Sequence, residues 1–133
     1  MPVELNHTIV YARDKKESAQ YLAELLNLPK PISFGPFMVV QLSNGVTLDF
    51  ADSDGEVKQQ HLAFKVEENE FDEIIGRIRR RKLAYWADPH RHTPGKINND
   101  YGGRGVYFTD ADDNVLEILT RDYEMGIRSN VGS

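Results

Sequence analysis

The chain repeats one order of predicted elements twice, and this repeat limits the folds that it can adopt. In each half a short strand precedes an amphipathic helix, and three further strands follow the helix. The first half spans about residues 4–52 and the second about residues 59–121 of a chain of 133 residues. We therefore predict a single α+β domain of two βαβββ modules, with residues 122–133 as a mobile C-terminal tail. Each helix would cover one face of a four-stranded antiparallel sheet and leave the other face open.

Hydrophobic patterns and turn residues locate the elements of the first half. Residues 4–11 are predicted as a strand, and Asp14 followed by Glu17 has the spacing of a helix capping box. Pro29 and Pro31 would end the helix that begins there. The three strands that follow are expected at residues 32–35, 37–43 and 46–51.

The second half restarts the same order with a strand at residues 61–66. Asn69 is a plausible cap for the next helix, which carries four large apolar residues at helical spacing. These residues are Phe71, Ile74, Ile75 and Ile78. Strands are then expected at residues 83–87, 105–110 and 114–120, with a long loop of turn residues after the first of them.

One histidine and one carboxylate in each half are predicted to share a sheet face. Side chains at every second position of a strand point to the same side. His7 lies in the first strand of the first half and Asp49 in its last strand, while His61 and Glu117 hold the corresponding places in the second half. All four are expected on the face away from the helix, where they would converge if the two halves pair.

These four side chains could form a metal site of nitrogen and oxygen donors. Such a donor set suits Fe(II), Mn(II), Ni(II), Zn(II) or Co(II). The neighbours of Glu117 in its strand are apolar, and a buried carboxylate is tolerated when it coordinates a metal. The alternative is that each histidine is an ordinary core or surface residue, because single matches of this kind are often structural.

Composition narrows the classes of partner and compartment. Lys and Arg number 16 against 21 Asp and Glu, a net charge of −5 that argues against nucleic acid and anionic membranes as partners. The absence of cysteine excludes disulfides, thiolate ligands and thiol nucleophiles. No apolar run approaches the ~20 residues of a membrane helix, and the N-terminus does not have the pattern of a signal peptide. We therefore expect a cytoplasmic protein.

Three segments of the chain carry a resemblance to a known family. They are "LNHTIVYARD" and "QHLAFKV", which begin the two modules, and "GRGVYFTDADDNVLEI", which ends the second. Over residues 4–121 the sequence resembles the vicinal oxygen chelate superfamily, which includes glyoxalases, bleomycin resistance proteins and extradiol dioxygenases. The family's usual turn is "DPDGN", and here Ala111 replaces its proline and Asp113 its glycine. A hairpin tolerates both changes.

The resemblance implies a cupped mixed or antiparallel sheet, formed by the two modules around one divalent metal. It implies His7, His61 and Glu117 as ligands, and Asp49 matches the position of a fourth ligand, a glutamate, in glyoxalase I. A small-molecule substrate with adjacent oxygens and a homodimer are implied as well. Dimerisation also follows from the open sheets, whose edges are usually paired or protected.

The type of chemistry is less constrained by the sequence. Tyr107 lies ten residues before Glu117, where extradiol dioxygenases carry a catalytic tyrosine, but the histidine that precedes it in that group is replaced by "INND". His92, or His90 beside it, could substitute as the catalytic base. Ile9 stands where fosfomycin-modifying enzymes have threonine, and the glutamate and basic cluster of glyoxalase I are missing.

Two hypotheses of different classes follow. The first is a metal-dependent lyase or dioxygenase that uses the metal as a Lewis acid. The second is a binding protein of the bleomycin resistance type, which sequesters a small molecule without chemistry. Metal content would distinguish them, because the binding proteins generally lack the metal ligands.

Overall fold

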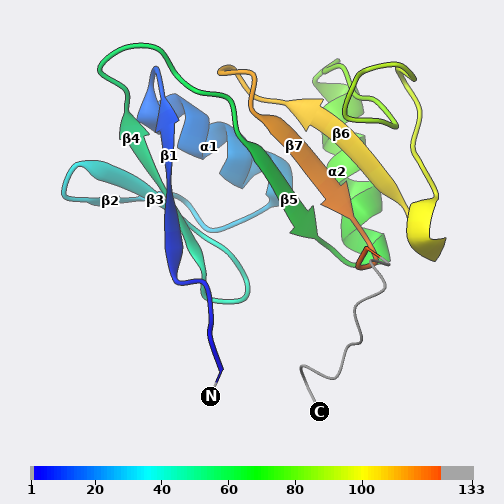
Figure 1. The fold of residues 1–133 in the computed structure, drawn as a ribbon, viewed down its shortest axis with the longest axis horizontal. Coiled ribbons are helices and arrows are strands. Elements are labelled where there is room, and N and C mark those ends of the chain that lie inside the picture. The colour runs from blue at the N-terminus through cyan, green and yellow to red at the C-terminus, as the bar shows by residue number, and fades with distance from the viewer. Residues whose placement is uncertain (1, 124–133) are drawn as a thin grey trace.

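The structure is a computed structural model that describes residues 2–123 and places them in two modules side by side (Figure 1). The elements of the first module are β1 (His7–Ala12), α1 (Lys15–Leu26), β2 (Ile32–Phe34), β3 (Phe37–Gln41) and β4 (Thr47–Asp52). Those of the second are β5 (His61–Lys65), α2 (Glu68–Arg80), the short 3-10 helix η1 (Asp100–Gly102), β6 (Gly105–Thr109) and β7 (Val115–Leu119). From residue 124 on, the predicted tail lies outside the described residues.

Each module contains one mixed sheet. The strand order is β1-β4-β3-β2 in the first and β5-β7-β6 in the second. β1 pairs with β4 and β5 pairs with β7 in parallel, while the remaining pairs are antiparallel. The mixed sheets agree with the mixed or antiparallel arrangement that the family resemblance implies, and only the antiparallel sheets expected from the element pattern were wrong. The helix after the first strand returns the chain to the end where that strand began. The two chain reversals that follow leave the last strand running in the same direction as the first strand, beside which it lies.

The strand predicted at residues 83–87 is reduced to isolated bridges at Trp86, one to Tyr107 of β6 and one to Pro94. Trp86 and Tyr107 exchange hydrogen bonds of 2.8 Å. The backbone on either side is used by the following loop, because the carbonyl of Tyr85 accepts from Gly95 and the amide of Ala87 donates to Thr93. These loop bonds lie on the edge away from β6. On the β6 side, the backbone of Gly105 exchanges hydrogen bonds with Asn98, so it does not pair with the residues that directly follow Trp86.

The caps of the two helices differ in how well the sequence predicts them. Asp14 caps α1 as expected, since its side chain accepts from the backbone amides of Lys16 and Glu17. The cap of α2 is Glu67, which forms a capping box with Glu70. Asn69 lies inside the first turn, so its predicted role as the cap was wrong.

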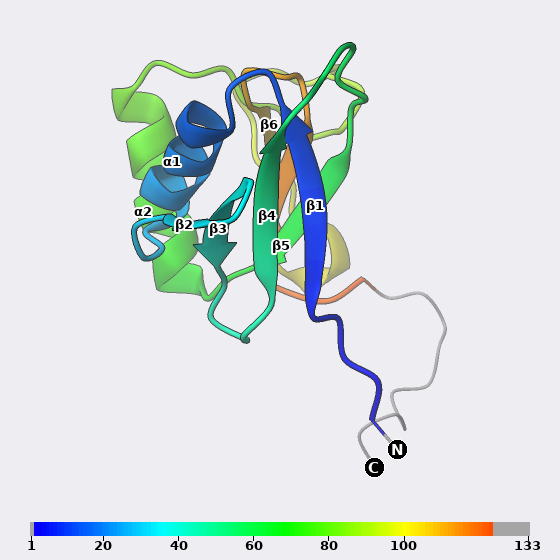
Figure 2. The same ribbon diagram turned by 90° about the vertical axis from the view of Figure 1, so that its left-hand side faces the viewer.

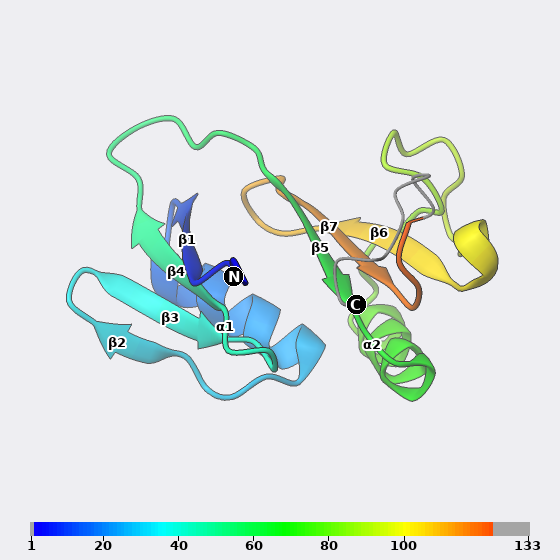
Figure 3. The same ribbon diagram turned by 60° about the horizontal axis from the view of Figure 1, so that its bottom comes forward.

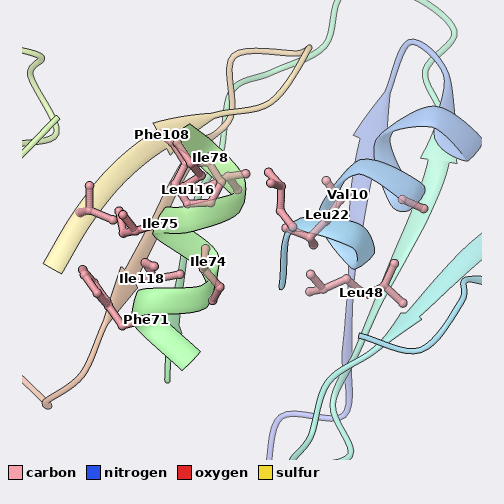
Figure 4. Close-up of a cluster of buried hydrophobic side chains, with 14 of the residues drawn as sticks. Val10, Leu22, Leu48, Phe71, Ile74, Ile75, Ile78, Phe108, Leu116 and Ile118 are labelled. Carbon is pink, nitrogen blue, oxygen red and sulfur yellow. The ribbon is translucent and has the colours of Figure 1, made fainter. Parts of the chain in front are cut away.

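Both helices lie on the same side of the molecule and their sheets on the other (Figure 2). The buried face of each sheet packs on its helix, and the two modules share one continuous apolar core (Figure 4). Val10 and Leu48 contribute from the first sheet, and Phe108 and Ile118 from the second. A view from below shows α1 behind β1 and β4 and α2 below β5 and β7 (Figure 3).

Polar contacts also join the modules within one chain. The guanidinium of Arg13 donates from Nε to the buried carboxylate of Asp112 at 2.9 Å, and the hydroxyl of Ser18 donates to the same carboxylate at 3.2 Å. The hydroxyl of Tyr21 donates to the carbonyl of Thr109 at 2.7 Å. These bonds fix the two sheets relative to each other. Within residues 2–123, no helix has the length and apolar character needed to cross a membrane.

Candidate metal centre

A row of four residues crosses the open face of the second sheet. Glu117 on β7 lies directly opposite Ala63 on β5 and Tyr107 on β6, and Tyr107 in turn pairs with Trp86. Residues that pair directly across neighbouring strands point to the same face. The row therefore places the Glu117 carboxylate on the face away from α2, between an aromatic residue and a small one.

The carboxylate of Glu117 has a hydrogen-bonding partner on each oxygen. The residue is only 2% exposed. Its Oε1 lies 3.0 Å from Nε2 of His61, and its Oε2 accepts a hydrogen bond from the phenol of Tyr123. These contacts explain how a carboxylate is accommodated in an otherwise apolar strand, because burying a charge without partners is costly.

The spacing of His61 and Glu117 fits two ligands of one metal ion. Two donor atoms at right angles around an ion, each about 2.1 Å from it, would lie roughly 3 Å apart. The Nε2–Oε1 distance of 3.0 Å matches that separation. Imidazole nitrogen and carboxylate oxygen are also donors that first-row divalent metals accept.

Two tyrosines border this pair. The ring of Tyr107 stands edge-on to His61, with the ring centres 5.9 Å apart. Burial raises the pKa of Tyr107, and burial together with the bond to Glu117 raises the pKa of Tyr123. Both phenols are therefore protonated at neutral pH and can donate hydrogen bonds to an oxygen anion.

The first sheet carries His7 and Asp49 on its own open face, but they do not contact each other. Nδ1 of His7, which is exposed, lies 2.7 Å from the side-chain oxygen of Asn6. Asp49 is half-buried, and its Oδ1 accepts from the hydroxyl of Thr47 at 2.9 Å. Each candidate ligand of this module is thus held by a near neighbour in the sequence.

Residues 2–123 of one chain do not bring three of the predicted ligands together. Among these residues, no group of three or more histidine, aspartate or glutamate side chains could hold one metal ion. His61 and Glu117 form a pair on the second sheet, whereas His7 and Asp49 remain on the first. One chain therefore presents two parts of a donor set on two separate faces.

His92, the predicted catalytic base, lies in the exposed loop that follows Trp86. Its backbone amide donates to Asp88, and its Nδ1 lies 3.6 Å from the carboxylate of Asp88. Its ring faces that of His90 with the centres 5.9 Å apart. These contacts hold His92 within its own loop, while Tyr107, the other predicted catalytic residue, lies beside His61 and Glu117.

Sequence reasoning missed Tyr123, which directly contacts Glu117. Residues 122–133 were predicted as a tail because no hydrophobic period marks them. The one available signal was an aromatic residue a few positions after the last strand. That signal says nothing about a return of the chain onto the sheet.

Comparisons with known proteins support the fold over almost the whole chain. No family model matches the sequence. The solved structure of the oxidase ChaP-H1 is 58% identical and superimposes with a TM-score of 0.90, covering 91% of this chain and 98% of that one. The oxidase ChaP-H2 is 54% identical with a TM-score of 0.91, covering 96% and 100%.

A curated relative from Listeria monocytogenes is named for fosfomycin resistance and not as an oxidase. The fosfomycin resistance protein FosX of that organism is 26% identical in an alignment 124 positions long, which covers 86% of this chain and 86% of that protein. The predicted α+β fold is confirmed by these similarities, which extend through both modules.

Proposed function

We propose that this chain, which belongs to the vicinal oxygen chelate superfamily, is a metal-dependent enzyme acting on a small molecule with two adjacent oxygens. The observation that carries the proposal is the His61–Glu117 pair, whose donor atoms lie 3.0 Å apart on an open sheet face. A buried carboxylate beside an imidazole is costly to maintain without a role, and coordination of a cation supplies one.

The third ligand in this proposal is His7 of a second copy of the chain. In a twofold dimer the same contact is made twice, so one copy's first sheet can face the other copy's second sheet. Such an arrangement would bring His7 of one copy to His61 and Glu117 of the other, and would cover both open faces. The homodimer expected from the sequence then becomes a requirement of the site.

The residues around the pair suit activation of a bound oxygen atom. A divalent ion held there would supply positive charge that polarises two adjacent substrate oxygens. Tyr107, protonated and beside His61, would donate a hydrogen bond to the oxygen that gains negative charge. Asp49 would accept a hydrogen bond from a bound water or serve as a further ligand.

The names of the similar proteins favour oxidation over isomerisation or lysis. The two solved relatives described above, at 58% and 54% identity, are named as oxidases. Fosfomycin is a less suitable substrate, because Ile9 stands in place of the expected threonine and lies directly opposite Asp49 in the first sheet. We therefore infer an oxidative reaction on a small organic substrate.

A binding protein without chemistry is the second candidate. The observation in its favour is the apolar character of the first sheet's open face, where Ile32 and Phe34 are exposed and Val39 lies between Ile32 and Asp49. Such a face could hold an apolar ligand without a metal. The two candidates differ in whether the protein needs a cation.

Metal analysis separates these candidates. The purified protein is loaded with Mn²⁺, Co²⁺ or Ni²⁺, desalted and assayed for metal, together with Glu117→Ala and the control Glu56→Ala in an exposed loop. The wild type and the control should retain about one ion per chain, and Glu117→Ala should retain none. Chelator should lower the melting temperature of the wild type by several degrees (on the order of 2–8 °C) and leave that of Glu117→Ala unchanged. An unmoved wild-type melt together with full metal retention by Glu117→Ala would favour the binding protein.

A further inference from the structure

The chain turns back onto the open face of the second sheet directly after β7. β7 ends at Leu119, and a strand rises about 3.3 Å per residue, so a straight continuation would carry Tyr123 roughly 13 Å beyond it. Instead the phenol of Tyr123 donates a hydrogen bond to Oε2 of Glu117, in the middle of the strand. The segment that follows the strand thus contributes a side chain to the candidate metal centre.

Two hydrogen bonds mark where the ladder between β6 and β7 ends. The amide of Thr120 donates to the carbonyl of Arg104 at 3.0 Å, which continues the register of the ladder by one pair. The amide of Arg104 donates at 2.9 Å to the hydroxyl of Thr120 rather than to its carbonyl, so the chain leaves the ladder after this residue. Gly103 permits the approach, because a Cβ at that position would lie 2.6 Å from both the Thr120 hydroxyl and a side-chain carbon of Arg121. The turn is therefore a defined part of the fold rather than a loose extension of β7.

The ring of Tyr123 packs against that of Tyr101, with the centres 4.9 Å apart and a tilt of 38°. Asp122, the preceding residue, forms an exposed ion pair of 3.2 Å with Lys65 on β5. The ring contact thus supports the phenol on one side while its hydroxyl donates to Glu117.

The two contacts of Glu117 use different oxygens of its carboxylate. Oε2 is taken by Tyr123, and Oε1 lies beside Nε2 of His61. A glutamate side chain has several rotatable bonds, so a carboxylate held on one oxygen loses less freedom when the other oxygen binds an ion. Outer-shell partners of this kind orient metal ligands and are needed for full metal affinity.

We propose that Tyr123 is a positioning residue, whose hydroxyl fixes Glu117 so that Oε1 and the imidazole of His61 are presented together to a divalent metal. This inference rests on the proposed function, because it assigns a role toward the metal of that site. The ring of Tyr123 is 40% exposed, so its burial is not the main reason for its presence. The group that contacts Glu117 is the hydroxyl. A phenylalanine at this position would keep the ring and remove only the hydroxyl.

The test compares two Tyr→Phe substitutions. Mn²⁺ binding is measured by calorimetric titration for the wild type, Tyr123→Phe and the matched control Tyr101→Phe, which keeps the stacked ring and has no bond to Glu117. Tyr123→Phe should weaken Mn²⁺ binding by about 10- to 100-fold, whereas Tyr101→Phe should stay close to the wild type. The visible spectrum of bound Co²⁺ should change in Tyr123→Phe alone. In chelator, Tyr101→Phe should melt close to the wild type, whereas Tyr123→Phe should melt lower by a few degrees (on the order of 2–8 °C), because Oε2 of the buried Glu117 loses its partner. Binding is therefore measured well below the melting temperatures of all three proteins.

The outcomes distinguish this inference from the function on which it rests. Wild-type affinity and an unchanged Co²⁺ spectrum in Tyr123→Phe, with binding lost in Glu117→Ala, would overturn the role of Tyr123 and leave the metal site in place. Equal weakening in Tyr101→Phe and Tyr123→Phe would also overturn it, because a hydroxyl that does not contact Glu117 would then matter as much as the one that does. Absence of Mn²⁺ and Co²⁺ binding in the wild type would overturn both.

Discussion

The two modules place the same types of residue at equivalent positions but hold them differently. His7 and Asp49 are offset by two residues on neighbouring parallel strands, and His61 and Glu117 have the same offset. In the second module the pair is in contact at 3.0 Å. In the first module each side chain is bonded to a different neighbour.

The residue beside each carboxylate explains the difference. Thr47 lies two positions before Asp49, and its hydroxyl donates to that carboxylate. Val115 takes the equivalent place before Glu117 and has no donor to offer. Glu117 is also longer by one methylene group, and it reaches His61. Equivalent positions in a repeat thus do not guarantee equivalent roles, because the neighbouring side chain decides which partner a carboxylate finds.

Removing the carboxylate from each module should give the largest contrast. Glu117→Ala should weaken Mn²⁺ binding by more than about 100-fold, since it deletes a direct ligand, whereas Asp49→Ala should cost about tenfold or less, as expected for an outer partner. Calorimetric titration of the two variants under the same conditions measures both effects. Equal losses would show that the two carboxylates serve the metal in the same way, contrary to this comparison.

Removing the histidine from each module should affect metal-free stability unequally. His61→Ala leaves Oε1 of the buried Glu117 without its partner and should lower the free energy of unfolding by roughly 1–3 kcal/mol. Among the described residues, His7 is exposed and hydrogen-bonded only to Asn6. His7→Ala should therefore change the free energy of unfolding by less than about 0.5 kcal/mol. Urea unfolding in the presence of chelator compares the two variants, and a larger loss in His7→Ala would reverse the comparison.

The smallest effect is expected from making the first module resemble the second. Thr47→Val removes the hydrogen bond to Asp49 and should lower the free energy of unfolding by about 1 kcal/mol or less. Asp49 is then free to approach a bound metal, so Mn²⁺ affinity should stay the same or rise. Unfolding and titration of this variant check both statements, and a clear loss of metal affinity would show that Thr47 orients Asp49 for binding.

Much of the fold follows from the hydrophobic pattern of the sequence. The order of strands and helices, and the face on which each candidate ligand lies, depend on local periods of two and 3.6 residues. Buried residues such as Val10, Phe50 and Ile74 fall where those periods place them. The strand predicted near Trp86 was shortened because Asn98, in the loop that follows, takes the backbone of Gly105 in β6, a long-range pairing that leaves no periodic signal.

The candidate site was only partly accessible from the sequence. The pairing of His61 with Glu117 follows from strand register, which the matched positions of the repeat suggested. Tyr123 could not be predicted, because its position depends on a turn after the last strand and on the close approach allowed by Gly103. The distance between His7 and the other ligands depends on how whole modules meet, which no local pattern encodes.

Subunit mixing tests most directly whether the metal site is shared between two copies. His7→Ala and Glu117→Ala, each expected to hold no metal alone, are unfolded together in equal amounts, refolded and loaded with Mn²⁺. Half of the dimers would be mixed, and each would contain one intact site, so metal content should recover to about a quarter of that of the wild type. The control mixture of His61→Ala with Glu117→Ala should recover none, because both changes lie on the same sheet. Recovery in the first mixture alone is the predicted result, and no recovery in either mixture would contradict a site shared across the dimer.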